Sequence, residues 1–185
     1  LEQYGIPKER ITYIPNFVSK ETFYPVDAAT KASLRVKHGY DPKRFTVLGS
    51  GQIQTRKGVL DFVKLAKQNP SVQFIWTGGF SFGKITEGYA ELEKIVKDPP
   101  SNLAFPGIIE RSKMVQYYNM SDLFLLPSYN ELFPMSVLEA FSTNTPVMLR
   151  DLDLYQSIIS GYYLPTANVS EMNTELNELL LDPDK

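Results

Sequence analysis

The amino-acid sequence predicts an α/β domain built on a doubly wound parallel sheet, and three observations support this fold class. Short, continuously apolar runs, such as residues 45–49 and 72–76, indicate strands that are buried on both faces. Stretches with apolar residues at helical spacing separate these runs. Strands and helices therefore alternate, and right-handed crossovers between parallel strands place helices on both faces of the sheet.

Apolar runs of three to five residues define the expected strands. Branched and aromatic side chains dominate these runs, which suits the pleated and buried surface of a central strand. Glycine, proline and polar residues interrupt the chain between the runs. In chain order, the expected strands are 11–14, 45–49, 72–76, 103–105, 123–126 and 146–149.

Helical spacing and end signals define the expected helices. Asp27 can cap the first helix, and Gly39 suits its carboxyl end. Pro134 fits the first turn of a later helix, because the missing N–H of proline costs nothing there. In chain order, the expected helices are 28–38, 58–67, 89–96, 112–120, 134–142, 154–159 and 170–181.

Composition limits the classes of function. The 185 residues suffice for one domain, which would bury roughly 70 % of its unfolded surface. A net charge of −2 without a basic stretch argues against a nucleic-acid partner. Cysteine is absent, which excludes disulfides and thiolate nucleophiles and favours a cytoplasmic setting. His38 is the only histidine, which excludes a histidine-based triad and a multi-histidine metal site.

The loop after the first central strand carries two adjacent cations. Ligands of open parallel sheets bind at the carboxyl ends of the strands, so this loop is a candidate site. Its start, with Gly49 and Gly51, resembles a dinucleotide fingerprint, but Gln54 occupies the position of the third glycine. Arg56 and Lys57 oppose the dipole of the helix that they precede, which favours a nearby anion. The alternative is that Arg56 and Lys57 are ordinary surface charges in contact with water.

The loops after the next two strands offer backbone groups and apolar surface. Gly79 belongs to a glycine-rich loop that allows close approach of a ligand, and Phe80 and Phe82 could form a pocket wall. A flexible loop explains this segment equally well. Ile108 and Ile109 follow the third central strand and suit a planar base.

Glu131 and Glu139 stand on either side of a predicted helix start. The free N–H groups of Met135 and Ser136 between them would attract an anion. A carboxylate on each side of an anion site suits a ligand that consists of a sugar, a diphosphate and a ribose. Glutamates that only stabilise the helix start are the alternative.

Taken together, these segments resemble the C-terminal, donor-binding domain of retaining glycosyltransferases of family 4, which have the GT-B fold. The similarity runs in order along nearly the whole chain. It is carried by Ile14-Pro15-Asn16, Phe23-Tyr24-Pro25, Gly51 with Lys57-Gly58, Phe105-Pro106-Gly107, Ser121-Asp122, Pro127-Ser128, Glu131 with Leu138-Glu139-Ala140, and Thr145-Pro146-Val147. The resemblance implies a Rossmann-like domain that forms the C-terminal half of a GT-B enzyme.

The resemblance also implies a role for each candidate residue. Lys57 would neutralise the donor diphosphate and Glu131 would face the transferred sugar, so these two are the expected catalytic residues. Glu139 would hold the ribose hydroxyls. The N–H groups of Phe133 and Met135 would assist at the diphosphate. The base edge would meet the loop formed by Gly107, Ile108 and Ile109.

Two departures from the family pattern affect the expected donor site. Gln52 stands where relatives often carry an arginine directly after the glycine at position 51, and Arg56 is a candidate for the missing charge. Pro134 stands where relatives often have glycine, which removes one possible amide donor. Gly51, Gln52, Arg56, Gly79 and Pro134 complete the expected donor-binding residues.

By this resemblance, the chain is the donor half of an enzyme that moves a hexose from a UDP-sugar with retention, without a metal or other cofactor. Three segments, 56–58, 78–83 and 150–155, look like bacterial enzymes that glycosylate diacylglycerol or glycosyl-diacylglycerol. A (glyco)lipid acceptor and a parent enzyme at the inner face of the cell membrane are therefore expected. A non-catalytic nucleotide-binding or regulatory module, or a nucleotide-sugar epimerase of the same fold, is the alternative.

The expected domain organisation follows from the same resemblance. Residues 1–185 would form one donor-binding domain, with residues 1–26 as the connection from an N-terminal acceptor domain. The sequence starts with Leu1 and reads at first like the end of a helix, which agrees with this expectation. The domain alone is expected to be inactive, because the acceptor site would lie in the other half.

Overall fold

The computed structural model describes residues 4–12, 16–81 and 83–182. In this part of the chain, six parallel strands form one sheet in the order β3-β2-β1-β4-β5-β6. The strands are β1 (Thr46–Ser50), β2 (Gln73–Thr77), β3 (Leu103–Gly107), β4 (Leu123–Leu126), β5 (Val147–Arg150) and β6 (Leu164–Thr166). The strand order reverses between β1 and β4, and open α/β sheets bind ligands at such a switch point.

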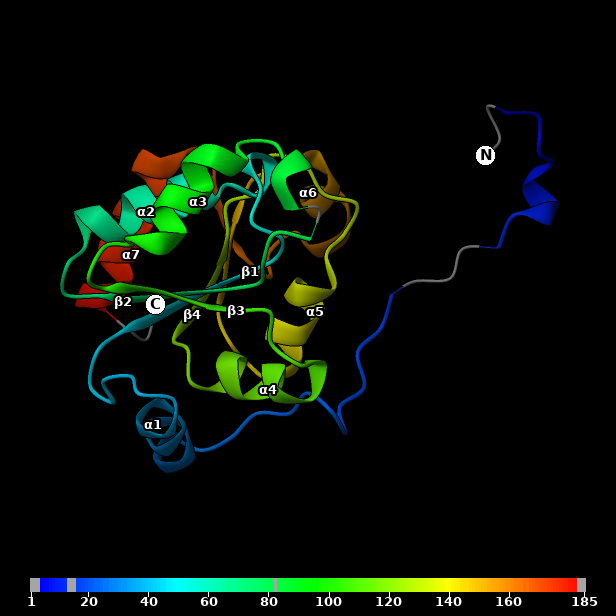
Figure 1. Ribbon diagram of the computed structural model, residues 1–185. Coiled ribbons are helices and arrows are strands. Elements are labelled where there is room, and N and C mark those ends of the chain that lie inside the picture. Colours follow the sequence, from blue (N-terminus) through cyan, green and yellow to red (C-terminus); the bar gives the residue numbers. More distant parts are fainter. Residues whose placement is uncertain (1–3, 13–15, 82, 183–185) are drawn as a thin grey trace.

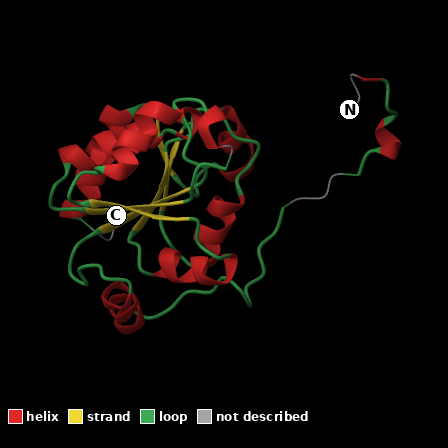
Figure 2. Ribbon diagram, viewed as in Figure 1, coloured by secondary structure: helices red, strands yellow, loops and turns green. Residues whose placement is uncertain are grey.

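Helices cover both faces of the sheet (Figures 1 and 2). One face carries α2 (Val59–Gln68), α3 (Tyr89–Lys97) and α7 (Val169–Leu181). The other face carries α4 (Arg111–Asn119), α5 (Met135–Ser142) and α6 (Asp153–Ile159). α1 (Ala28–Lys37) packs beside α4. The connections contain the 3₁₀ turns η2 (Lys8–Arg10), η3 (Thr55–Lys57) and η4 (Gly83–Ile85).

Each central strand contributes to two hydrophobic cores, because successive side chains point to opposite faces. Phe74 and Trp76 of β2 make edge contacts with Phe62 of α2, with ring centroids 5.3 and 5.1 Å apart. Ile75, between them in the sequence, is buried in the core on the other face, with Tyr118 of α4. Burial of both faces explains the continuous apolar runs in the sequence and confirms the predicted doubly wound sheet.

The predicted elements from residue 28 onward are present, with small shifts at their ends. Asp27 caps α1 as predicted, since its carboxylate accepts a hydrogen bond of 2.7 Å from the Thr30 N–H. Pro134 has an extended ψ of 135°, so α5 begins one residue later than predicted. The edge strand β6 was not predicted, because its apolar run is short and contains Pro165, which an edge strand tolerates.

The predicted strand at residues 11–14 is wrong for Ile11 and Thr12, which belong to no strand. The rest of that run lies outside the described residues. The same is true of Pro15, which carries part of the family resemblance, and of Phe82. None of the described helices combines the length and the apolar character needed to cross a membrane.

The segment before α1 is tied to α4 and α5. The side chain of Asn119 accepts a hydrogen bond from the Val26 N–H at 3.1 Å and donates one to the Tyr24 carbonyl at 2.9 Å. The Ser142 hydroxyl of α5 donates to the Phe23 carbonyl at 2.6 Å. The buried Phe23 ring therefore has a fixed place against both helices.

Candidate functional site

The loops that follow β1, β2 and β3 meet at the carboxyl edge of the sheet. Backbone hydrogen bonds join them: the Ile53 N–H donates to the Gly79 carbonyl at 3.0 Å, and the Gly78 N–H donates to the Gly107 carbonyl at 2.8 Å. A Cβ atom at Gly78 would lie 1.9 Å from the Gly51 carbonyl oxygen, which leaves no room for a side chain. The structure thus brings together the glycines that the sequence predicted to approach the ligand.

Lys57 and Glu131 form an ion pair at this edge. The Nζ atom of Lys57 lies 2.5 Å from Oε1 of Glu131, and the two side chains are 13 % and 6 % exposed. The Lys57 side chain runs beside Gly51, whose added Cβ would lie 3.7 Å from Cδ of the lysine. Two charges that are this buried require a partner. An incoming diphosphate would compete with Glu131 for the ammonium group.

The loop after β4 is held against the start of α2. The Tyr129 N–H donates to the Arg56 carbonyl at 2.9 Å, and the Arg56 guanidinium donates to the Asn130 carbonyl at 3.3 Å. Arg56, Asn130, Glu131 and Leu132 line a hollow of about 310 Å³ beside the ion pair. Two of the predicted donor-binding residues therefore border an open space of sugar size.

Gln52 has a local partner. Its side-chain oxygen accepts a hydrogen bond of 2.6 Å from the amide of Gln54. Phe80, in the loop after β2, packs on Tyr89 of α3, with ring centroids 4.8 Å apart. This contact places Phe80 partly in the core on that face of the sheet.

A cluster around the buried Arg150 fixes the loop after β4 from the side of β5. Arg150 binds Asp61 of α2 through Nη2 at 2.5 Å and donates through Nε to the Pro127 carbonyl at 3.1 Å. The Tyr129 hydroxyl donates to Asp61 at 2.6 Å, and the Arg150 guanidinium carbon lies 4.0 Å from the centre of the Tyr129 ring. The loop that carries Glu131 is therefore anchored by charge-assisted hydrogen bonds.

The connection from this loop into α5 has a strained backbone. Phe133 adopts a positive φ of 110°, which is unfavourable for a residue with a side chain. Its ring lies 6.4 Å from that of Tyr155 in α6. The turn ends at Pro134, so Met135 is the first residue of α5. The N–H groups of a first helical turn have no partner within the helix and attract anions.

Glu139 of α5 is a buried carboxylate with two partners on α4. Oε1 lies 3.1 Å from Nη1 of Arg111, and Oε2 accepts a hydrogen bond of 2.9 Å from the Tyr118 hydroxyl. Burial raises the pKa of the Glu139 carboxyl, while the Tyr118 hydrogen bond and the Arg111 charge oppose this shift. Burial, and next the nearby Glu139 charge, raise the pKa of the Tyr118 hydroxyl.

The predicted base loop presents an apolar side chain to solvent. Ile108 is 77 % exposed. A Cβ atom at Gly79 would lie 2.9 Å from Cγ1 of Ile108, so the two residues are neighbours. Ile109 instead packs against the core on the α4 and α5 face. The exposed isoleucine beside a bare glycine offers a surface for a flat apolar group.

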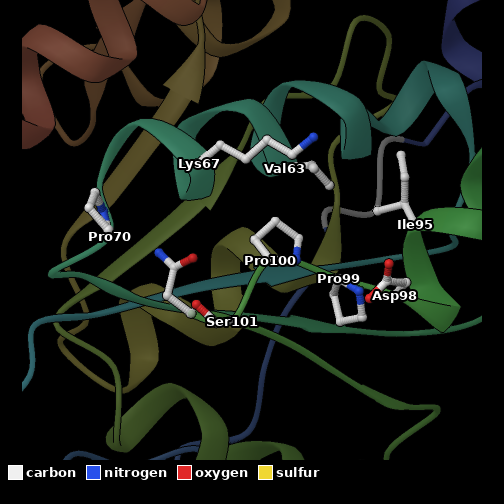
Figure 3. A pocket seen from close by; sticks show the side chains of 9 residues that line it. Val63, Lys67, Pro70, Ile95, Asp98, Pro99, Pro100 and Ser101 are labelled. Carbon is white, nitrogen blue, oxygen red and sulfur yellow. The ribbon is translucent and has the colours of Figure 1, made fainter.

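A second hollow, of about 430 Å³, lies at the opposite, amino edge of the sheet (Figure 3). Lys67 near the end of α2, Asp98 at the end of α3 and Pro100 before β3 are among its lining residues. The carboxyl ends of helices carry partial negative charge and are unsuited to a diphosphate. Among the described residues, no three acidic, histidine or cysteine side chains gather in a way that could hold a metal ion.

Sequence reasoning missed two arginines near the site: Arg111, which pairs with Glu139, and Arg150, which pairs with Asp61. Arg111 starts α4, where a cation opposes the helix dipole, and this is the signal that singled out Arg56 and Lys57. Arg150 is a charged residue at the end of an apolar strand, and its burial shows that it has a structural partner. Asp122 is structural, since it accepts hydrogen bonds from Arg35 and from the Thr46 N–H.

The family model described as "Glycosyl transferases group 1" matches residues 30–185. The chain belongs to this family. It is 50 % identical over 179 residues to the alpha-galactosylglucosyldiacylglycerol synthase of Streptococcus pneumoniae; the aligned region covers 97 % of this chain and 48 % of that protein. It is 28 % identical over 155 residues to the processive diacylglycerol alpha-glucosyltransferase of Acholeplasma laidlawii; here the aligned region covers 84 % of this chain and 46 % of that protein.

The fold agrees with solved structures. Anabaena HepE in complex with UDP and glucose superposes with a TM-score of 0.83 at 20 % identity, over 98 % of this chain and 50 % of that one. The predicted Rossmann-like fold and the predicted glycosyltransferase resemblance are both confirmed. The family membership does not favour the regulatory-module or epimerase alternatives. The chain spans about half the length of these two curated relatives.

Proposed function

We propose that this glycosyltransferase domain binds the UDP-sugar donor from which the whole enzyme transfers a hexose with retention to a (glyco)lipid acceptor. One observation carries the proposal. The buried Lys57–Glu131 pair lies at the switch point of the sheet, and α5 extends from the same loop to Glu139. A cation paired with one carboxylate, and a second carboxylate on the helix that follows the same loop, match a ligand whose diphosphate joins two groups that carry hydroxyls.

Lys57 is proposed to bind the diphosphate. The ammonium group would exchange its contact with Glu131 for the ligand phosphate, and the first N–H groups of α5, including that of Met135, would contribute further donors. Such preorganised positive groups stabilise the charge that develops on a departing diphosphate. This role requires no metal or other cofactor from the domain.

Glu131 and Glu139 are proposed to hold the two ends of the donor. Once the diphosphate takes Lys57, the Glu131 carboxylate becomes free to accept hydrogen bonds from the hydroxyls of the hexose, in the hollow that Arg56 and Leu132 also line. Glu139 would accept hydrogen bonds from the ribose. The base would lie on the surface formed by Gly107, Ile108 and Ile109, beside Gly79. Arg56 would approach the diphosphate in place of the arginine that Gln52 replaces.

The acceptor is proposed from the two relatives. Both are named for the glycosylation of a diacylglycerol lipid, and this chain covers about half of each. We therefore expect an N-terminal acceptor domain in the parent chain, with residues 1–26 as the connection to the donor domain 1–185. The parent enzyme is expected to act from the cytoplasm at the inner face of the cell membrane.

Calorimetry with UDP, with and without EDTA, tests this proposal on the isolated domain. We expect binding in the micromolar to millimolar range that EDTA leaves unchanged. Lys57→Met should weaken binding, whereas the matched change Lys67→Met, at the opposite edge of the sheet, should not. Affinity that disappears on chelation would contradict the metal-free role, and equal effects of the two lysine changes would exclude a specific diphosphate site.

A further inference from the structure

We propose that Arg111 is a positioning residue for the donor nucleotide: it holds the Glu139 carboxylate in the orientation that accepts hydrogen bonds from the ribose. Phe23, in the segment before α1, holds Arg111 in turn. The inference rests on the proposed role of Glu139 and adds a residue to which neither the family resemblance nor the relatives give a role.

The two oxygens of Glu139 are fixed separately. Nη1 of Arg111 lies 3.1 Å from Oε1, and the Tyr118 hydroxyl donates to Oε2 at 2.9 Å. A carboxylate can accept about four hydrogen bonds. With one contact on each oxygen, the carboxylate plane is set and acceptor positions remain on both oxygens. The remaining positions are therefore presented to a ligand in a fixed direction.

Exposure of the three side chains agrees with this arrangement. The Glu139 side chain is 8 % exposed and Tyr118 is fully buried, so both lie on the inner side of the contact. The Arg111 side chain is 63 % exposed, so it is the partner of Glu139 that lies nearer to solvent. Loss of Arg111 would leave the Glu139 carboxylate with the Tyr118 hydroxyl as its remaining side-chain contact of the two described above, and with freedom to rotate about its last torsion.

The position of Arg111 depends on a buried aromatic ring. Its guanidinium carbon lies 5.5 Å from the centre of the Phe23 ring, within the range of a cation–π contact. The Phe23 carbonyl accepts a hydrogen bond of 2.6 Å from the Ser142 hydroxyl of α5. The segment before α1, the start of α4 and helix α5 thus share one set of contacts around Glu139.

The charge of Arg111 also favours the form of Glu139 that binds hydroxyls well. Burial favours the protonated carboxyl, and the guanidinium opposes this effect. Hydrogen bonds to an ionised acceptor are stronger than those to a neutral acceptor. Arg111 therefore orients the carboxylate and helps to keep it charged, although it need not touch the nucleotide.

Calorimetry with two ligands, UDP and 2′,3′-dideoxy-UDP, tests the inference on the isolated domain. The wild-type domain should prefer UDP by roughly tenfold or more, because only UDP can donate hydrogen bonds from ribose hydroxyls to Glu139. Arg111→Gln should lose most of this preference while its affinity for dideoxy-UDP stays unchanged. Arg111→Lys should keep part of the preference, since it keeps the charge.

Two further variants make the result decisive. Lys113→Gln removes another cation from the same helix. Lys113 pairs with Glu110 at 2.9 Å, so this variant should behave like the wild type. The double variant Arg111→Gln/Glu139→Gln should bind UDP no more weakly than Glu139→Gln alone, because both changes remove the same contact. Thermal melts of each variant confirm that the domain is folded.

The possible failures are distinguishable. If Glu139→Gln leaves UDP affinity unchanged, the proposed role of Glu139 is wrong. If Glu139→Gln weakens UDP but Arg111→Gln keeps the preference for UDP, the positioning role is wrong. Equal losses for both ligands in Arg111→Gln, or losses that add fully in the double variant, would show a direct or purely structural role and would also overturn the inference.

Discussion

Replacement of Arg150 by methionine should destabilise the domain strongly. Arg150 is 8 % exposed and bridges three parts of the chain. Its Nη2 atom lies 2.5 Å from Asp61 of α2, its Nε atom donates to the Pro127 carbonyl at 3.1 Å, and its Nη1 atom donates to the Ala167 carbonyl at 2.8 Å. Methionine fills a similar volume but leaves the Asp61 carboxylate without the guanidinium.

The expected magnitude follows from this burial. Removal of one partner of a buried ion pair costs about 3–5 kcal/mol of unfolding free energy, because the other charge stays uncompensated. For a domain of this size, each 1 kcal/mol lowers the melting temperature by about 2–4 °C, so a decrease of roughly 6–20 °C is expected. The Asp61 side chain is 17 % exposed, which places the expected loss toward the lower end of this range.

Urea unfolding followed by circular dichroism measures the effect. Lys97→Met is the matched control, since it breaks an ion pair with Glu93 in which the lysine side chain is 70 % exposed. This surface change should leave the urea midpoint unaltered within error. A loss below about 1 kcal/mol for Arg150→Met, or equal losses for the two variants, would refute the reasoning that burial makes the Arg150 cluster important.

Two further predictions concern Glu139 and the glycine loops. Burial raises the pKa of Glu139 above its ordinary value of 4.5. Between pH 4.5 and the native pKa, the native state therefore binds more protons than the unfolded state. Stability falls as pH rises through this window. Glu139→Gln removes this titration. The melting temperature of the variant, relative to that of the wild type, should therefore increase from pH 4 to pH 7.5. A difference that stays constant over this pH range would contradict the prediction. Gly78→Ala would place a Cβ 1.9 Å from the Gly51 carbonyl oxygen at a φ of 132°, whereas Gly39→Ala has open space at a φ of 79°. Gly39→Ala should cost about 1–2 kcal/mol of unfolding free energy and Gly78→Ala at least twice as much, and equal urea midpoints would exclude the close packing of the loops.

The sheet could be predicted because a central strand that is buried on both faces has a continuous run of apolar residues in the sequence. Such runs, for example 72–76, alternate with helical segments along the chain, and this order indicates a parallel sheet. The edge strand with Pro165 has one short run and less burial, so its pattern was too weak. Ile11 and Thr12, the described part of another predicted strand, belong to no strand, which shows that apolar residues alone do not define one.

The candidate site was predictable in its loops but not in its pairs. The sequence placed Lys57 and Glu131 after different strands, and their contact depends on β1 and β4 being neighbours in the sheet. Arg111 also meets Glu139 only through packing of α4 against α5. Periodicity indicates which side chains are buried, but partners that are distant in sequence require the order of strands and the packing of helices.

Calorimetric titration of UDP into Glu139→Gln and Glu131→Gln tests the central claim most directly. Glu139→Gln should weaken binding about ten- to a hundredfold, since hydrogen bonds to a charged acceptor contribute roughly 1.5–3 kcal/mol. Glu131→Gln should not weaken binding, because UDP lacks the sugar and because the change frees Lys57 from its ion pair. Equal losses of UDP affinity in the two variants would contradict the assignment of ribose to Glu139 and of hexose to Glu131.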